Sequence, residues 1–203
     1  MKKFLILLSA LLLSFQVQAA LISGPDIIAA VSVQEDSPTN SAQQAFNEQQ
    51  GVTLAGNLVI DGGFITAGTR VDSHLIFLNT TGGRNDPSVT DRATWGFDGV
   101  ILGVMSDIDG VAMGNSNLEL AAFGNYFADV GGLPFNNAGM EGADFYNILL
   151  GTTIDVNMLV TEPGDWIRVI TASAVPVPAA AFLFAPALLG FVGLRRKAKL
   201  AVK

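Results

Sequence analysis

The sequence predicts a mainly β fold, an antiparallel two-sheet sandwich of jelly-roll character with one or two short helices. Short segments alternate apolar with polar side chains and are rich in β-branched residues, which is typical of strands. Clusters of Gly, Asn and Asp separate these segments. Their spacing favours a sandwich over a parallel sheet, which would need long helical crossovers. We expect the sandwich to form one domain over residues 20–173.

Strands are expected where the alternation is clearest. These segments are Ile27–Gln34, Val52–Ile60, Arg70–Leu78, Ala93–Phe97, Val100–Ser106, Asp144–Leu149, Thr153–Val160 and Trp166–Ala172. The turn signals between them are Asp61-Gly62-Gly63, Thr81-Gly82-Gly83 and Glu162-Pro163-Gly164-Asp165. In the last of these, proline and glycine suit the two central positions of a type II turn.

Two short helical segments are expected within the same domain. The first covers Ser41–Gln50, with Asn40 or Ser41 as its N-cap and Gly51 as its stop. The second is a helical turn near Leu118–Phe127.

Charge separates the domain from the two ends of the chain. All 18 carboxylates lie within residues 20–173, where the basic residues are Arg70, Arg84, Arg92 and Arg168. A surface this acidic repels nucleic acid and anionic lipid, so no nucleic-acid partner is expected. The chain has no cysteine, which excludes disulfides, thiolate metal sites and thiol nucleophiles.

Residues 1–19 have the three parts of a secretory signal peptide. Lys2 and Lys3 form the basic start, Phe4 to Phe15 the apolar run, and Val17-Gln18-Ala19 the small-residue cleavage site. The alternative is an N-terminal membrane anchor, but the apolar run is too short to span a bilayer. We expect cleavage after Ala19.

Residues 174–203 combine a proline motif, an apolar segment and a basic end. Val175-Pro176-Val177-Pro178 interrupts the preceding strand, because each proline lacks a donor and extends the residue before it. The uncharged segment 179–194 is predicted as a transmembrane helix. Arg195-Arg196-Lys197 then stays on the cytoplasmic side by the positive-inside rule, so the domain faces away from the cytoplasm. An ordinary membrane tether is the alternative.

In its order and spacing, this tail resembles a PEP-CTERM sorting signal of exopolysaccharide-producing Gram-negative bacteria. Val177 replaces the central glutamate of the motif, as in a Val-Pro-x-Pro variant. The resemblance implies export through the secretion machinery, anchoring in the inner membrane, and processing by an exosortase near Pro178. The mature protein would then reach the cell surface or the extracellular space.

His74 is the only histidine, and it shares one face of its predicted strand with Asp72 and Ile76. A Ser-His-Asp triad is recognised by geometry rather than order, but no Gly-x-Ser-x-Gly elbow accompanies His74. We expect a hydrogen-bonded structural histidine. A histidine-rich transition-metal site is excluded by count.

Calcium is the one cofactor that the sequence raises. Hard oxygen ligands of the kind Ca²⁺ prefers occur at Asp107, Asp109, Asn115 and Asn117, and a second oxygen-rich group occurs at Asn85, Asp86 and Asp91. The first group does not match an EF-hand loop. Asp, Asn and Gly also serve ordinary solvated turns, which is the interpretation we favour.

Two further sets of residues, one acidic and one aromatic, are candidates for carbohydrate chemistry. An acid pair for glycoside hydrolysis could come from Glu141, Asp144, Glu162 and Asp165, although acids are numerous enough to pair by chance. Aromatic side chains that could stack on a sugar are Trp95, Tyr126, Tyr146 and Trp166. Of these, Trp95 and Trp166 lie in strand patterns and are expected in the core.

The leading expectation is a non-enzymatic cell-surface or extracellular-matrix protein. The alternative is a module that binds the cell's exopolysaccharide, which would need a concave, aromatic-lined face. A hydrolase would need a cleft with paired acids or a serine near His74. Ice binding would need a flat array of evenly spaced threonines, and the threonines here are scattered.

Overall fold

The computed structural model describes residues 20–34, 37–80, 87–123, 139–161 and 164–173. These residues belong to one compact unit, 18–174. The predicted mainly β class with antiparallel sheets is confirmed. The predicted signal peptide and the predicted transmembrane segment 179–194 lie outside the described residues. Within the described ranges, no helix is long and apolar enough to cross a membrane.

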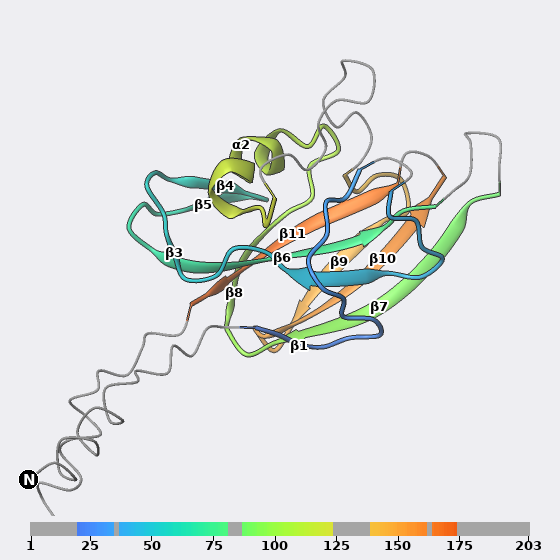
Figure 1. Cartoon of the computed structure of the whole chain (residues 1–203), viewed down its shortest axis with the longest axis horizontal. Coiled ribbons are helices and arrows are strands. Elements are labelled where there is room, and N and C mark those ends of the chain that lie inside the picture. The colour runs from blue at the N-terminus through green and yellow to red at the C-terminus, as the bar shows by residue number, and fades with distance from the viewer. Residues whose placement is uncertain (1–19, 35–36, 81–86, 124–138, 162–163, 174–203) are drawn as a thin grey trace, which may run out of the picture. The chain divides into compact units, whose positions relative to one another are not determined.

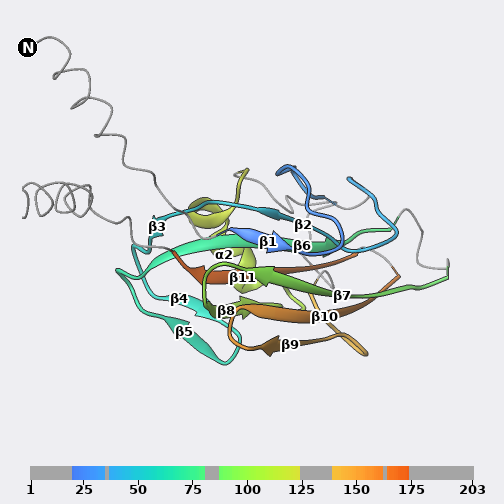
Figure 2. The ribbon, with the colours of Figure 1, turned by 90° about the horizontal axis from the view of Figure 1, so that it is seen from below.

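Two antiparallel sheets lie face to face in this unit (Figures 1 and 2). The four-stranded sheet consists, in order, of β1 (Leu21–Ser23), β7 (Val89–Phe97), β10 (Thr153–Val160) and β9 (Phe145–Leu149). The five-stranded sheet consists of β2 (Gln44–Asn47), β6 (Arg70–Leu78), β11 (Asp165–Ala172) and β8 (Ile101–Met105), with β3 (Val52–Thr53) also paired to β6.

The main core lies between the two sheets. Trp95 on β7 and Met158 on β10 meet Ile76 on β6 and Val169 on β11, and all four are fully buried. These residues occupy every second position of their strands, because successive side chains point to opposite faces of a sheet. The opposite face of the four-stranded sheet carries exposed Arg92 and other more accessible side chains.

The five-stranded sheet is covered on its second face as well. The covering layer consists of the helix α2 (Val111–Leu120), the hairpin of β4 (Leu58–Ile60) and β5 (Gly63–Ile65), and the segment 28–33. Figure 1 shows α2 and the hairpin beside the same sheet. Two apolar clusters, one around Phe77 and Trp166 and one around Ile170, fill this second interface. As a result, nearly every residue of β6 and β11 is buried.

Glycines permit close approach and tight turning in the covering hairpin. A side chain at Gly103 on β8 would collide with Ile60 of the hairpin, so the lack of a Cβ at this position brings the two elements together. The predicted turn at Asp61-Gly62-Gly63 is confirmed, because it connects β4 to β5. Gly62 has a φ of 76°, which glycine adopts without strain.

Most predicted strands are confirmed, but three segments differ. The predicted helix Ser41–Gln50 is wrong, because β2 occupies its centre and pairs with β6. Its helix-forming residues are overridden by burial of Ala45 and Phe46 on opposite faces of the sheet. The predicted strand Ile27–Gln34 forms only isolated bridges at its two ends. The predicted strand Val52–Ile60 is divided into β3 and β4.

The second predicted helical segment is displaced. Helix α2 begins at Val111 and ends at Leu120, so it overlaps the expected Leu118–Phe127 only at its C-terminal end. Residues 124–127 lie outside the described part of the chain. Ala121 is already extended, which ends the helix. The short strands β1 and β5 had no prediction.

Candidate functional site

Three carboxylates meet at the end of the two-sheet core where β10 leads toward β11. Glu141, Asp144 and Asp165 each offer an oxygen atom, and these three atoms all lie within 4.8 Å of one another. All three residues were among the sequence candidates for paired acids. The fourth candidate, Glu162, lies outside the described residues.

Backbone hydrogen bonds hold the carboxylate of Asp144 in place. Asp144 stands just before β9, and its Oδ1 accepts a hydrogen bond of 2.6 Å from the backbone N–H of Leu159 on β10. Its Oδ2 accepts another of 2.9 Å from the N–H of Glu141. The N–H of Asp144 donates back to the carbonyl of Glu141 at 3.0 Å. Glu141 and Asp144 therefore form one tight turn attached to the four-stranded sheet.

Asp165 belongs to the other sheet. It is the first residue of β11 and lies opposite Leu78 of β6. Its side chain falls on the face that carries Ile167 and Val169 into the core between the sheets. The cluster therefore joins one sheet to the other.

Burial makes Asp165 the electrostatically unusual member. The residue is only 3% exposed. Burial, with the negative charges of Asp144 and Glu141 as further causes, raises its pKa to about 9. Burial and the charge of Asp144 also raise the pKa of Glu141, which is more exposed. The site thus disfavours three simultaneous negative charges unless something positive joins it.

The predicted calcium loop has a different arrangement. Asp107 and Asp109 lie in the turn before α2, whereas Asn115 and Asn117 lie within the helix. The Oδ2 of Asp107 accepts a hydrogen bond of 3.1 Å from the N–H of Ala112. The Oδ1 of Asn117 accepts one of 2.8 Å from Arg168. Oδ2 of Asp107 and Oδ1 of Asn117 therefore have protein partners, whereas Oδ1 of Asp107 is buried without a hydrogen-bond partner among the described residues. Of the second oxygen-rich group, Asn85 and Asp86 lie outside the described residues.

His74 is a hydrogen-bonded residue, as predicted. It is fully buried between the sheets, with Nδ1 2.8 Å from Oδ1 of Asn47 and Nε2 2.9 Å from Oγ1 of Thr171. The Asn47 oxygen also accepts the N–H of Leu21, so this oxygen acts as an acceptor and Nδ1 carries the proton. Burial lowers the pKa of His74 to about 3. A neutral, enclosed ring of this kind has no access to a substrate.

Two of the aromatic candidates are core residues, as expected. Trp95 is fully buried and Trp166 is 2% exposed. The indole N–H of Trp95 donates to Oε1 of Gln43 at 3.0 Å. Tyr146 is partly buried and donates to Asp61 at 3.0 Å. Tyr126 lies outside the described residues.

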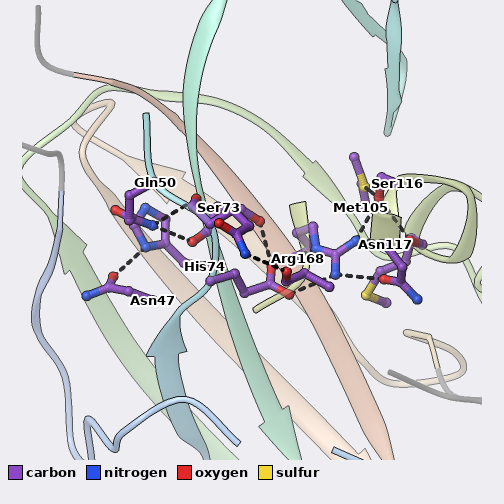
Figure 3. A network of polar contacts seen from close by, with 12 residues as sticks. Asn47, Gln50, Ser73, His74, Met105, Ser116, Asn117 and Arg168 are labelled. Carbon is purple, nitrogen blue, oxygen red and sulfur yellow. Dashed lines mark hydrogen bonds and ion pairs between the residues drawn. The ribbon is translucent and has the colours of Figure 1, made fainter. Parts of the chain in front are cut away.

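A buried ion pair was missed by the sequence reasoning (Figure 3). Arg168 on β11 and Glu48 beside β2 are joined at 2.6 Å, and both side chains are inaccessible to solvent. Ser73 donates to Glu48 at 2.5 Å, while Arg168 donates to Ser116 and Asn117 of α2 at 2.7 and 2.8 Å. One signal was available, because Arg168 interrupts an otherwise apolar run in its strand.

No protein-family model matches the chain, and searches of the curated proteins and of the solved structures found no match.

Proposed function

We propose that this chain is an exported, non-enzymatic protein of the bacterial cell surface or extracellular matrix, sorted by its C-terminal PEP-CTERM-like tail. The observation that carries the proposal is the division of the chain. One compact β-rich unit, 18–174, fills the interval between a signal-peptide-like start and the proline motif at Val175–Pro178. The tail would make the chain a substrate for an exosortase, with the unit as its delivered ectodomain.

Two features of the unit support that role: its two-sheet topology and its packed core without disulfides. Its two antiparallel sheets exchange consecutive strands, as when β6 is followed by β7 and β10 by β11, so a sandwich of jelly-roll-like character is part of the proposal. The chain has no cysteine and reaches a packed core without disulfides. The main core joins both sheets, which suits a domain that folds after export without a disulfide-forming system.

The test is the intact mass of the protein from membranes and from culture medium, in cells with and without exosortase. We expect a species that begins at Ala20 and ends near Pro178, and that disappears when the exosortase is deleted. A double variant, Pro176→Ala with Pro178→Ala, should block this processing in cells that contain the enzyme.

Pro87→Ala is the matched control, because Pro87 is an exposed proline of the domain outside the motif. It should be processed like the native chain. A membrane-bound species that retains Lys203 in both strains would overturn sorting and leave a plain tethered ectodomain. A species that retains Met1 would overturn export through a cleaved signal.

A further inference from the structure

The carboxylate cluster lies where a single bound group would touch both sheets. Asp144 is fixed to β10 of the four-stranded sheet through the N–H of Leu159, and Asp165 begins β11 of the five-stranded sheet. Residues 161–164 connect these two strands directly. A ligand shared by Asp144 and Asp165 would therefore cross-link the two sheets.

A second observation concerns one oxygen of Asp165. The Oδ2 atom is buried, and no hydrogen-bond donor among the described residues reaches it. An orphaned carboxylate oxygen is costly in a protein interior, and nearly all such atoms have a partner. Its neighbours Asp144 and Glu141 are themselves carboxylates, and a hydrogen bond between Asp165 and Asp144 requires that one of the two carry a proton. Among the described residues, no cation lies at this atom, so the cluster is held either by a shared proton or by a bound cation.

Two of the described arginines form ion pairs with carboxylates outside the cluster. Arg92 pairs with Asp155 on the outer face of the four-stranded sheet, and Arg168 pairs with Glu48 beneath α2. The guanidinium of Arg70 lies against Gly51 at a different position of the fold. Within the described part of the chain, none of these arginines therefore forms an ion pair with the cluster.

The dimensions and chemistry of the cluster suit a hard divalent cation. Ca²⁺ binds carboxylate oxygens at about 2.3 to 2.6 Å, so oxygens up to about 5 Å apart can share one ion. The three oxygens here fall within that span. Carboxylates can bind through one oxygen or both, which leaves room for water to complete the six to eight ligands that Ca²⁺ takes.

We propose that Glu141, Asp144 and Asp165 form a binding site for a divalent cation, with calcium as the best fit, that joins the two sheets. The ion supplies the missing partner of Asp165 and offsets the repulsion among three acids. Glu141 is the exposed member, so it provides the entry side of the site. The proposal rests on the geometry of the domain and stands independently of the sorting proposal.

Calorimetric titration of calcium into the metal-free, full-length chain in detergent tests the site. We expect one ion per chain with a Kd of about 0.1 to 1 mM, the range of extracellular calcium modules. The melting temperature should rise as calcium is added, because the ion binds only the folded state. Asp165→Asn and Glu141→Gln keep the side-chain shapes, and each should weaken binding by about tenfold or more.

Asp109→Asn is the matched control, because it removes one exposed acid from the other oxygen-rich loop. It should bind calcium like the native chain. If Asp165→Asn fails to fold, judged by near-ultraviolet circular dichroism, the exposed Glu141→Gln decides the question. The proposal is overturned if the native chain binds no calcium at about 10 mM, well above the extracellular range. It is equally overturned if both cluster variants bind as tightly as the native chain, or if Asp109→Asn abolishes binding.

Discussion

The two sheets of this protein differ in how many of their faces are buried. In the four-stranded sheet, β7 alternates between exposed Arg92 and Thr94 and buried Ala93 and Trp95, because its outer face meets solvent. In the five-stranded sheet, β11 is buried at every position from Asp165 to Thr171. The difference determines where polar side chains find their hydrogen-bond partners. On the first sheet water can serve them, whereas on the second sheet the protein itself must supply every hydrogen bond.

Two arginine–carboxylate pairs make the contrast concrete. Arg92 and Asp155 lie at 2.6 Å on the outer face of the four-stranded sheet, where the arginine side chain is 60% exposed and the Asp155 side chain 11%. Arg168 and Glu48 also lie at 2.6 Å, but both side chains are completely buried beneath α2. The distance is the same, so the two pairs differ in the burial of the arginine and in the further hydrogen bonds that Arg168 donates to α2.

The largest effect is expected from breaking the buried pair. Arg168→Met leaves Glu48 as an uncompensated buried charge and should lower the free energy of unfolding by about 3 to 5 kcal/mol. It also removes the donors that reach Ser116 and Asn117 of α2. Urea unfolding followed by tryptophan fluorescence measures this loss.

Two variants sharpen that result. Adding Glu48→Gln to Arg168→Met should restore part of the lost stability, because the orphaned charge is then gone. Arg92→Met on the outer face of the other sheet should lower the unfolding midpoint far less, since the guanidinium of Arg92 is exposed and an ion pair with a solvated partner contributes little. Equal losses for Arg92→Met and Arg168→Met would contradict the contrast between the sheets.

A second comparison uses apolar residues on the outer faces of the same two sheets. Ile170→Ala empties a position packed beneath the β4–β5 hairpin and should cost about 3 kcal/mol of unfolding free energy. Leu159→Ala removes a side chain that is 37% exposed on β10 and should cost about 1 kcal/mol or less. The midpoints of chemical unfolding measure both values. A Leu159 variant as unstable as the Ile170 variant would mean that something covers the outer face of the four-stranded sheet.

The same difference in burial explains how far the sequence alone could predict the fold. Periodicity identified Thr153–Val160 and Arg70–Leu78 with their observed bounds. It could not show that the five-stranded sheet has a covering layer, because the pattern within a strand does not tell which element packs against its second face. The segment Ser41–Gln50 was misassigned for a related reason. Its residues favour a helix locally, and only pairing with β6 makes them a strand.

The candidate site was predictable only in part. Sequence reasoning selected Glu141, Asp144 and Asp165 as acids of interest but could not bring them together, since Asp165 lies on a different sheet. Glu48 gave no signal at all, because its partner Arg168 is far away in the chain and only the fold makes them meet. By contrast, the prediction that His74 is hydrogen-bonded agrees with its contacts to Asn47 and Thr171.

His74 gives the third prediction, which concerns pH. Whereas Arg168 and Glu48 lie under the covering layer, His74 is a polar residue of the core between the two sheets. Its pKa falls from the usual 6.5 to about 3 in the folded protein, because burial disfavours the charged ring. In the unfolded chain the ring binds a proton below pH 6.5, while the folded chain still excludes it. The contribution of His74 to stability is therefore fully present above pH 6.5 and is lost progressively as the pH falls toward 3.

The measurement is the difference in unfolding free energy between the native chain and His74→Gln at several pH values. Titration of the carboxylates affects both proteins alike and cancels in that difference. Between pH 7 and pH 5 the native chain should lose about 2 kcal/mol relative to the variant, since each unit of pKa difference is worth about 1.4 kcal/mol. A difference that does not change with pH would mean that His74 accepts a proton in place. In that event the core between the sheets would tolerate a positive charge at His74 although no carboxylate among the described residues neutralises it there. Burial would then not determine the charge of a polar residue in the interface that the four-stranded and five-stranded sheets share.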